Sequence, residues 1–234
     1  MNNQEKQTQH EIASHIGRLL REAFGKGPQS IYVSINRPFV VIYLRNFLSP
    51  TEKILLQQGH VYSVQQTRSI VMETLIPEIK AYLQLLTGMN MQEFYFDWGL
   101  HNYSGVFVGI ASEENPLSQG LQEWCAGKKE LHVEIERISL LIQKIPDNIQ
   151  YYLINERTIL VVKSGIMISI AKELIRLGFE DNLKIAQRNL EKKYLFNNNQ
   201  FQKIVKSPIT DIFTDWNFHL DKSVIVFILN PIHD

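Results

Sequence analysis

The segment DWGLH at residues 97–101 returns as DWNFH at residues 215–219, an offset of 118 residues in a chain of 234. Each copy is followed by an apolar run rich in β-branched residues, VFVGI at 106–110 and VIVFIL at 224–229. Self-similarity at such a spacing indicates a duplicated structural unit. The sequence therefore predicts two copies of one fold, each within the usual size range of a domain.

The same order of elements precedes each repeated segment. In the first copy, apolar residues at three- and four-residue steps predict a helix that ends at GKGP, residues 25–28. Two β-rich runs at 31–36 and 39–45 then predict a strand pair. SPTE at 49–52 has the pattern of a capping box with proline at the first helical position, so a long helix is expected to start there.

Pro77 is expected to end, kink or restart this helix, because proline cannot donate the backbone hydrogen bond of a helix interior. Strands at 91–96 and 106–110 complete an α-β-β-α-β-β unit. The second copy repeats the helix stripe from Leu131 to Ile142 and the strand pair at 149–155 and 158–163.

We therefore expect an α+β protein with two tandem α-β-β-α-β-β repeats, each a small sheet packed against helices, related by approximate internal twofold symmetry. The expected boundaries are residues 8–112 for the first repeat and 130–231 for the second. Between them, residues 113–129 have the polar, turn-rich composition of a linker. The asparagine run at 197–199 predicts a loop.

Charge and hydropathy exclude several classes of protein. With 24 basic and 24 acidic side chains the net charge is +0, which removes the broad electrostatic footprint of a nucleic-acid-binding protein. No stretch has the ~18 consecutive apolar residues of a membrane-spanning helix, and residues 1–10 lack the apolar centre of a secretory signal. A cytoplasmic protein that is not membrane-embedded is expected, and its one cysteine, Cys125, fits a reducing compartment.

Gly25, Lys26 and Gly27 form one candidate ligand site, because glycines allow backbone amides and an ammonium group to approach an anion closely. The segment lies at a helix end, however, and it lacks the glycine spacing and the Lys-Ser/Thr pair of a nucleotide-binding loop. A helix stop is the favoured interpretation.

The repeated segment offers Asp97 and His101 in one copy and Asp215 and His219 in the other. These side chains are competent metal ligands, and a pseudo-twofold arrangement would bring them to one site. Aspartate at a strand-to-turn junction more often caps backbone amides, so no metal and no cofactor are expected. The tryptophans that follow the aspartates are expected to pack in the core.

An arginine lies on the apolar stripe of the long helix in both copies. The stripe of the first copy has steps of three and four residues and consists of Val61, Val64, Arg68, Val71 and Leu75. Arg188 occupies the comparable place in the second copy, and each arginine precedes an aspartate at a similar distance. Because a desolvated charge needs a partner, we expect the ion pairs Arg68 with Asp97 and Arg188 with Asp215. The alternative is an arginine that awaits an anionic ligand.

The first repeat resembles the bacterial MpsC-like domain, a family of unknown biochemical function. The resemblance rests on GKGP at 25–28, LSPTE at 48–52, Arg68, LTG at 86–88 and Asp97. It covers residues 8–112 and, more weakly, 128–231, where KIP replaces the first motif and ISIA at 168–171 has lost the proline and the glutamate. The family is named for association with a Na+-translocating, membrane-potential-generating system. The resemblance thus implies an accessory role near ion or inorganic-carbon transport and no catalytic mechanism.

The sequence favours a non-enzymatic cytosolic interaction or regulatory module with a protein partner. A membrane transport component is one candidate for that partner, and a homodimer is another arrangement compatible with the sequence. The alternative is a sensor of a small anionic ligand or a metal, with a site between the repeats. A hydrolytic enzyme ranks below both, because no Gly-x-Ser-x-Gly or His-Glu-x-x-His motif occurs. An interaction module predicts an exposed apolar surface, and a sensor predicts a pocket where Arg68, Asp97 and His101 converge.

Two further expectations concern function directly. Cys125 has no adjacent histidine, so its replacement by serine is expected to leave function intact. The first repeat keeps the glycine and capping motifs that the second has lost, so partner binding is expected to depend on the first repeat.

Overall fold

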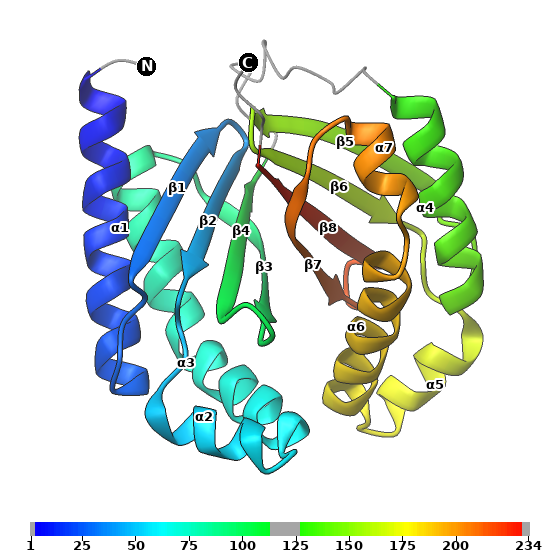
Figure 1. Ribbon diagram of the computed structural model, residues 1–234, viewed down its shortest axis with the longest axis horizontal. Helices are drawn as coiled ribbons and strands as arrows, with labels where there is room; N and C mark the ends of the chain where they lie inside the picture. Colours follow the sequence, from blue (N-terminus) through cyan, green and yellow to red (C-terminus); the bar gives the residue numbers. More distant parts are fainter. Residues whose placement is uncertain (1–2, 113–126, 231–234) are drawn as a thin grey trace. The chain divides into compact units, whose positions relative to one another are not determined.

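The computed structural model describes residues 3–112 and 127–230 (Figure 1). The chain divides into two compact units, Met1–Gly120 and Leu121–Asp234. Each unit contains a four-stranded antiparallel sheet and helices, so the predicted α+β class with two similar halves is confirmed. Cys125 and most of the expected linker at 113–129 lie outside the described residues. The predicted twofold relation between the units stays a prediction.

The first unit has the predicted order of elements, with the second predicted helix divided in two. Its sheet has the strand order β1-β2-β4-β3, with antiparallel neighbours throughout. The elements are α1 (Asn3–Phe24), β1 (Ser30–Asn36), β2 (Phe39–Arg45), α2 (Pro50–Gln57), α3 (Val61–Thr87), β3 (Met91–Gly99) and β4 (Ser104–Ala111). The first helix therefore begins before residue 8, the expected start of the repeat.

Glycines end α1 as the sequence indicated. Gly25 follows the last helical residue with a φ of 73°, the left-handed region in which glycine carries no steric penalty. A Cβ atom at Gly27 would lie 3.1 Å from the carbonyl oxygen of Gly17, so this glycine lets the chain pass close to α1. The interpretation of residues 25–28 as a helix stop is confirmed.

The break in the long helix falls at Gly59 and not at Pro77. α2 ends at Gln57, Gly59 has a φ of 80°, and α3 then runs without interruption through Pro77 to Thr87. The expectation that Pro77 ends or restarts the helix is wrong. Leu75 and Ile79 on either side of it are buried in the core. Tertiary packing therefore holds the helix together despite the missing backbone donor.

The core of the first unit lies between the sheet and the pair α1 and α3. Apolar residues of both helices meet alternate residues of the strands, among them Ile12, Ile16, Leu20, Met72, Ile79, Leu83, Val40, Ile42, Leu44, Phe96, Trp98 and Phe107. Burial of this kind is the main favourable contribution to folding. Of the apolar residues in the stripe predicted on the long helix, Val64 and Leu75 are buried, whereas Val61 is 43% exposed.

The second unit repeats the fold. Its strand order is β5-β6-β8-β7, the same order as in the first unit, so the prediction that both halves share one fold is confirmed at the level of topology. The elements are α4 (Lys128–Ile142), β5 (Asn148–Asn155), β6 (Thr158–Ser164), α5 (Ser169–Arg176), α6 (Glu180–Phe196), α7 (Gln200–Val205), β7 (Ile209–Asn217) and β8 (Lys222–Leu229).

Irregular details repeat as well. The pairing of β3 with β4 shifts register between Met91 and Glu93, and the pairing of β7 with β8 shifts between Ile209 and Asp211. The main difference lies in the long helix. α3 is continuous, whereas its counterpart is divided into α6 and α7 by the predicted asparagine loop at 197–199. Among the described residues, no helix combines the length and the apolar character needed to cross a bilayer.

Candidate functional site

Arg68 lies in the centre of the first unit and pairs with Glu52. The side chain of Arg68 is 0% exposed, and its Nε and one terminal nitrogen donate to the two carboxylate oxygens of Glu52 at 2.6 and 2.9 Å. The same terminal nitrogen donates to the carbonyl oxygen of Phe47 at 3.0 Å. This bidentate geometry is the strong form of an arginine–carboxylate pair.

Glu52 also forms the capping box of α2, in which it is the acidic residue. Its Oε2 accepts the backbone N–H of Ser49 at 2.8 Å, and its own N–H donates to the Ser49 hydroxyl at 3.3 Å. Burial alone would raise the pKa of Glu52, but the hydrogen bond and the charge of Arg68, together with the Ser49 bonds, hold that pKa below its usual value. The carboxylate is therefore ionised at neutral pH.

The expected pair between Arg68 and Asp97 is wrong. The guanidinium binds Glu52, while Asp97 is buried and accepts the backbone N–H of Trp98 at 2.7 Å. The indole of Trp98 stacks over the guanidinium of Arg68, and its ring centroid is 4.4 Å from the central guanidinium carbon. Asp97 and Trp98 are neighbours in β3, and successive strand residues point to opposite faces of a sheet.

Aromatic rings enclose the guanidinium of Arg68. The rings of Trp98, Phe47 and Phe24 have centroids 4.4, 4.8 and 5.5 Å from its central carbon. Within the described residues, the remaining terminal nitrogen has no hydrogen-bond partner. Cation–π attraction from the rings compensates part of that loss. Arg68 is therefore a structural residue of the core, and its guanidinium is not available to an external anion.

The second predicted pair is confirmed. Arg188 of α6 donates to Oδ1 of Asp215 in β7 at 2.6 Å, and both side chains are buried. Lys184 approaches the same oxygen at 3.3 Å. The counterpart of Glu52, at an offset of 119 residues, is Ala171, so the second unit has no carboxylate at that place. Its arginine pairs with the aspartate instead.

A second buried ion pair in this unit was not predicted. Lys163 of β6 donates to Glu191 of α6, and both side chains are almost completely buried. The other oxygen of Glu191 accepts the hydroxyl of Thr214 at 2.6 Å and the indole N–H of Trp216 at 2.9 Å. The sequence did carry a signal. Lys163 falls on one strand face with the core residues Ile159 and Val161.

The remaining predicted site residues do not converge. Lys26 is exposed in the loop after α1, and His101 is exposed in the turn between β3 and β4, whereas Arg68 is in the core. Gly25 and Gly27 serve the helix end described above. Both repeated tryptophans, Trp98 and Trp216, are buried as expected. Within the parts of the chain that the structure describes, no three His, Cys, Asp or Glu side chains are grouped as metal ligands would be.

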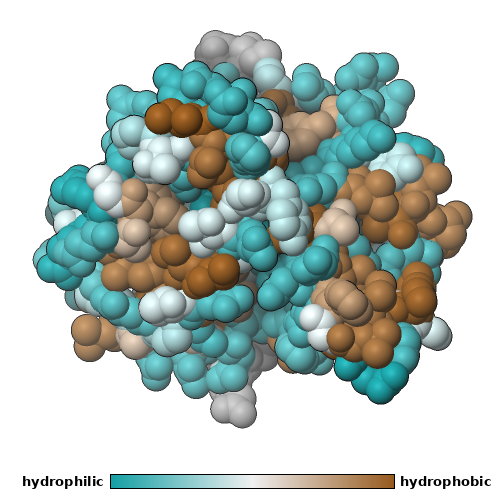
Figure 2. All heavy atoms as spheres, turned by 90° about the horizontal axis from the view of Figure 1, so that it is seen from below, coloured by the Kyte–Doolittle hydropathy of each residue, from teal (hydrophilic) through white to brown (hydrophobic). Residues whose placement is uncertain are grey.

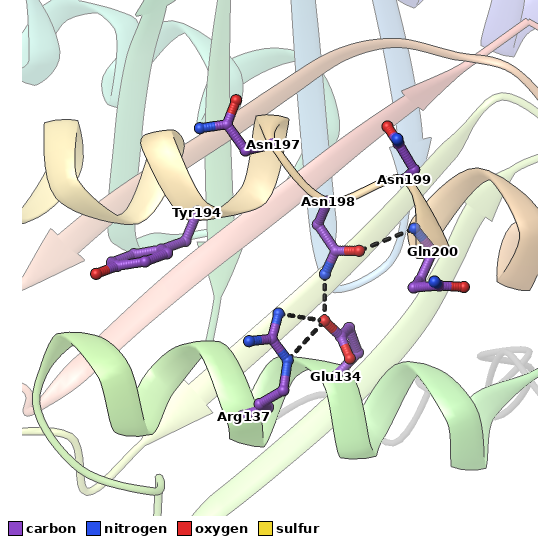
Figure 3. Close-up of a pocket in the computed structure, with 7 residues that line it drawn as sticks. All are labelled: Glu134, Arg137, Tyr194, Asn197, Asn198, Asn199 and Gln200. Atoms are coloured by element: carbon purple, nitrogen blue, oxygen red, sulfur yellow. Dashed lines mark hydrogen bonds and ion pairs between the residues drawn. The ribbon is translucent and has the colours of Figure 1, made fainter.

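The second unit also has an open hollow of about 560 Å³ between α4 and the loop that joins α6 to α7 (Figure 3). Its lining is polar and consists of Glu134, Arg137, Tyr194, Gln200 and the three asparagines at 197–199. Arg137 donates twice to one oxygen of Glu134, at 2.6 and 2.9 Å, and the Asn198 amide donates to the same oxygen. The Arg137 bonds outweigh burial and, with Asn198, hold the pKa of Glu134 below its usual value.

An apolar stripe, which we call the α5 stripe, runs along α5 and the residue that caps its C-terminal end. It consists of Ile170, Leu174 and Leu177, at successive steps of four and three residues. Ile170 and Leu177 are more than half exposed, and so is Phe179 just beyond the helix. Figure 2 shows the molecule from below the view of Figure 1, with apolar side chains exposed on that face. At the same offset of 119, the first unit has Thr51, Leu55 and Gln58, so the stripe belongs to the second unit.

The fold and the paired arginine define the first unit as a small α+β domain with a four-stranded sheet and an internal ion pair. Residues 4–113 match the family model described as "Na+-translocating membrane potential-generating system (MpsC)". The match to the MpsC family thus covers the first unit, and the second unit repeats the strand order of the first.

The chain is also similar to a protein named "Uncharacterized protein YbcI" from Bacillus subtilis (strain 168). The two are 26% identical over 114 residues, which cover 48% of this chain and 90% of YbcI. The alignment thus spans about one unit of this chain. No solved structure matches the chain.

Proposed function

We propose that the protein is a non-enzymatic, cytosolic interaction or regulatory module that serves a membrane ion-transport system. The observation that carries this proposal is the α5 stripe. Exposed apolar side chains that follow one helix face are typical of a surface that binds another protein. The description of the MpsC family names a membrane system, which suggests the class of partner.

The arrangement of the charged residues supports a binding role over an anion sensor. Arg68, the residue on which an anion site would depend, is held by Glu52 and three aromatic rings. The counterpart Arg188 is held by Asp215. Both arginines therefore stabilise the cores of their units, and neither offers a guanidinium to an external ligand.

Site-specific photocrosslinking tests the proposal. A photoreactive amino acid at Leu177, in the α5 stripe, is expected to crosslink to a component of a membrane transport system in cells that express the full chain. The matched control is the same amino acid at Gln58, the exposed polar residue at the equivalent position of the first unit. The crosslinked proteins are identified by mass spectrometry.

Crosslinks from Leu177 to soluble proteins alone, or equal yields from both positions, would contradict the proposal. The same comparison tests the prediction that binding depends on the first unit. A transport component crosslinked from Gln58 and not from Leu177 would support the first unit as the binding unit and exclude the α5 stripe.

A further inference from the structure

The polar hollow lies where the first unit has a closed contact between two helices. Glu134 and Arg137 of α4 correspond, at an offset of 119, to His15 and Arg18 of α1. In the first unit His15 stacks on Tyr82 of α3, with ring centroids 3.7 Å apart. Ile79, which precedes Tyr82 in the same helix, is completely buried. The helix–helix contact of the first unit is therefore filled by side chains.

The second unit replaces this contact with a loop and a hollow. α6 ends at Phe196, and residues 197–199 separate it from α7. Asn198 points towards Glu134 and Arg137, whereas Asn197 and Asn199 project the other way (Figure 3). An asparagine loop gives up helical hydrogen bonds and apolar burial that the other copy retains. A local departure from the rules of stability is expected above all at a functional site.

The side chains that line the hollow can hydrogen-bond to a ligand, and their charges sum to zero. Glu134 and Arg137 neutralise each other, although the side chain of Arg137 is 54% exposed and keeps donors for a ligand. Gln200 is exposed and offers an amide, which both donates and accepts. Tyr194 adds a half-buried ring and a hydroxyl at one end of the hollow (Figure 3).

We infer that the hollow binds a neutral polyhydroxylated ligand, a saccharide. Each sugar hydroxyl is both a donor and an acceptor, which suits a lining of amide, guanidinium, carboxylate and phenol groups. The apolar face of a sugar ring packs on an aromatic side chain such as Tyr194. The volume of about 560 Å³ falls within the range of small-molecule sites. This inference is independent of the proposed interaction function.

The test is a titration of the isotope-labelled full chain, followed by two-dimensional amide NMR. The probes are neutral sugars: glucose, galactose, mannose, N-acetylglucosamine, maltose, trehalose and sucrose. At least one of them is expected to shift, in a saturable way, the amide signals of residues 134–137 and 194–200. Inorganic phosphate and acetate are the charged comparison probes and are expected to leave these signals in place.

Variants link the signal to the hollow. Tyr194→Ala is expected to weaken binding of that sugar on the order of tenfold through loss of the ring contact, and Arg137→Ala is expected to weaken it as well. Arg18→Ala, the equivalent change in the first unit, is the matched control and should leave the affinity unchanged. If Tyr194→Ala does not fold by circular dichroism, the exposed Gln200→Ala replaces it.

Three outcomes overturn the inference. The first is that no sugar of the panel shifts these amides. The second is that the shifts persist with unchanged affinity in the Arg137→Ala variant and in the Tyr194 or Gln200 variant. The third is that phosphate or acetate shifts the same amide signals and binds with higher affinity than any sugar, which would make the hollow an anion site.

Discussion

Glu52→Gln is the sharpest perturbation of the first unit. The amide keeps the shape of the side chain and the oxygen that completes the capping box, since glutamine is accepted at that position. It removes the negative charge that faces Arg68, whose side chain is 0% exposed. The guanidinium would then be buried with only amide and carbonyl oxygens and aromatic rings around it.

The expected cost follows from burial. Breaking a buried ion pair by removal of one partner costs about 3–5 kcal/mol, because the other charge stays desolvated. The rings of Trp98, Phe47 and Phe24 retain about 1–2 kcal/mol of cation–π attraction with the guanidinium, which favours the lower end of that range. We therefore expect Glu52→Gln to lower the free energy of unfolding of the first unit by about 3 kcal/mol. Glu52→Ala should cost roughly 1 kcal/mol more, since it also leaves the backbone N–H of Ser49 without its side-chain acceptor.

Urea-dependent hydrogen exchange of the amides of β4 measures this free energy for the first unit separately. Glu173→Gln in the second unit, followed through exchange of the β8 amides of that unit, is the matched control. Arg176 binds Glu173 with the same two distances, 2.6 and 2.9 Å, but the side chains are 69% and 49% exposed. That variant is expected to produce no measurable change, because solvent screens the pair. Equal effects of the two substitutions would refute the reasoning that burial decides the cost.

The same pair predicts how stability depends on pH. The folded-state pKa of Glu52 lies below the ordinary value of a glutamate side chain. The ionised carboxylate therefore contributes fully above that value, and the contribution is lost as pH falls through the lower, folded-state pKa. The stability of the first unit should fall on acidification over this window in the wild type, and the fall should be smaller in Glu52→Gln. Parallel pH profiles of the two proteins would contradict the assignment.

Three further predictions concern other positions. Gly105→Ala should destabilise the first unit by at least about 1–3 kcal/mol through overpacking, because a Cβ atom there would lie 2.5 Å from the ring of Trp98; urea unfolding measures it. Lys163→Met should cost about 3–5 kcal/mol in the second unit, since it leaves Glu191 buried without its cation, and exchange of the β8 amides reports it. Cys125→Ser should leave the photocrosslinking yield from the α5 stripe unchanged; a loss of yield in a folded variant would contradict it.

Sequence reasoning found the elements because their periodicities are local properties. It also found the capping box at Ser49, which depends on residues three apart. It identified Arg68 and Arg188 as core charges but assigned only the second to its partner. The choice between Glu52 and Asp97 depends on which carboxylate reaches the guanidinium in three dimensions. A pattern along one chain does not contain that distance.

Other features were missed for related reasons. Pro77 was expected to interrupt α3, but burial of its neighbours outweighs the local preference. Lys163 and Glu191 are 28 residues apart and come from a strand and a helix, so their pairing appears only after folding. The asparagine run predicted the loop, but the hollow beside it also requires α4. The sequence pattern assigned Glu52 only to the capping box, and its pairing with Arg68 appears only in the folded unit.

The two buried tryptophans have chemically different surroundings, although they occupy the same place in the repeated unit. The indole of Trp98 lies among Phe24, Phe47, Phe96 and Phe107, with the guanidinium of Arg68 on its face. That of Trp216 donates its N–H to a carboxylate. Once Trp124 is replaced by phenylalanine, each remaining indole becomes an optical reporter of its own half. Fluorescence emission can then follow the melting of one copy of the duplication while the other is still folded.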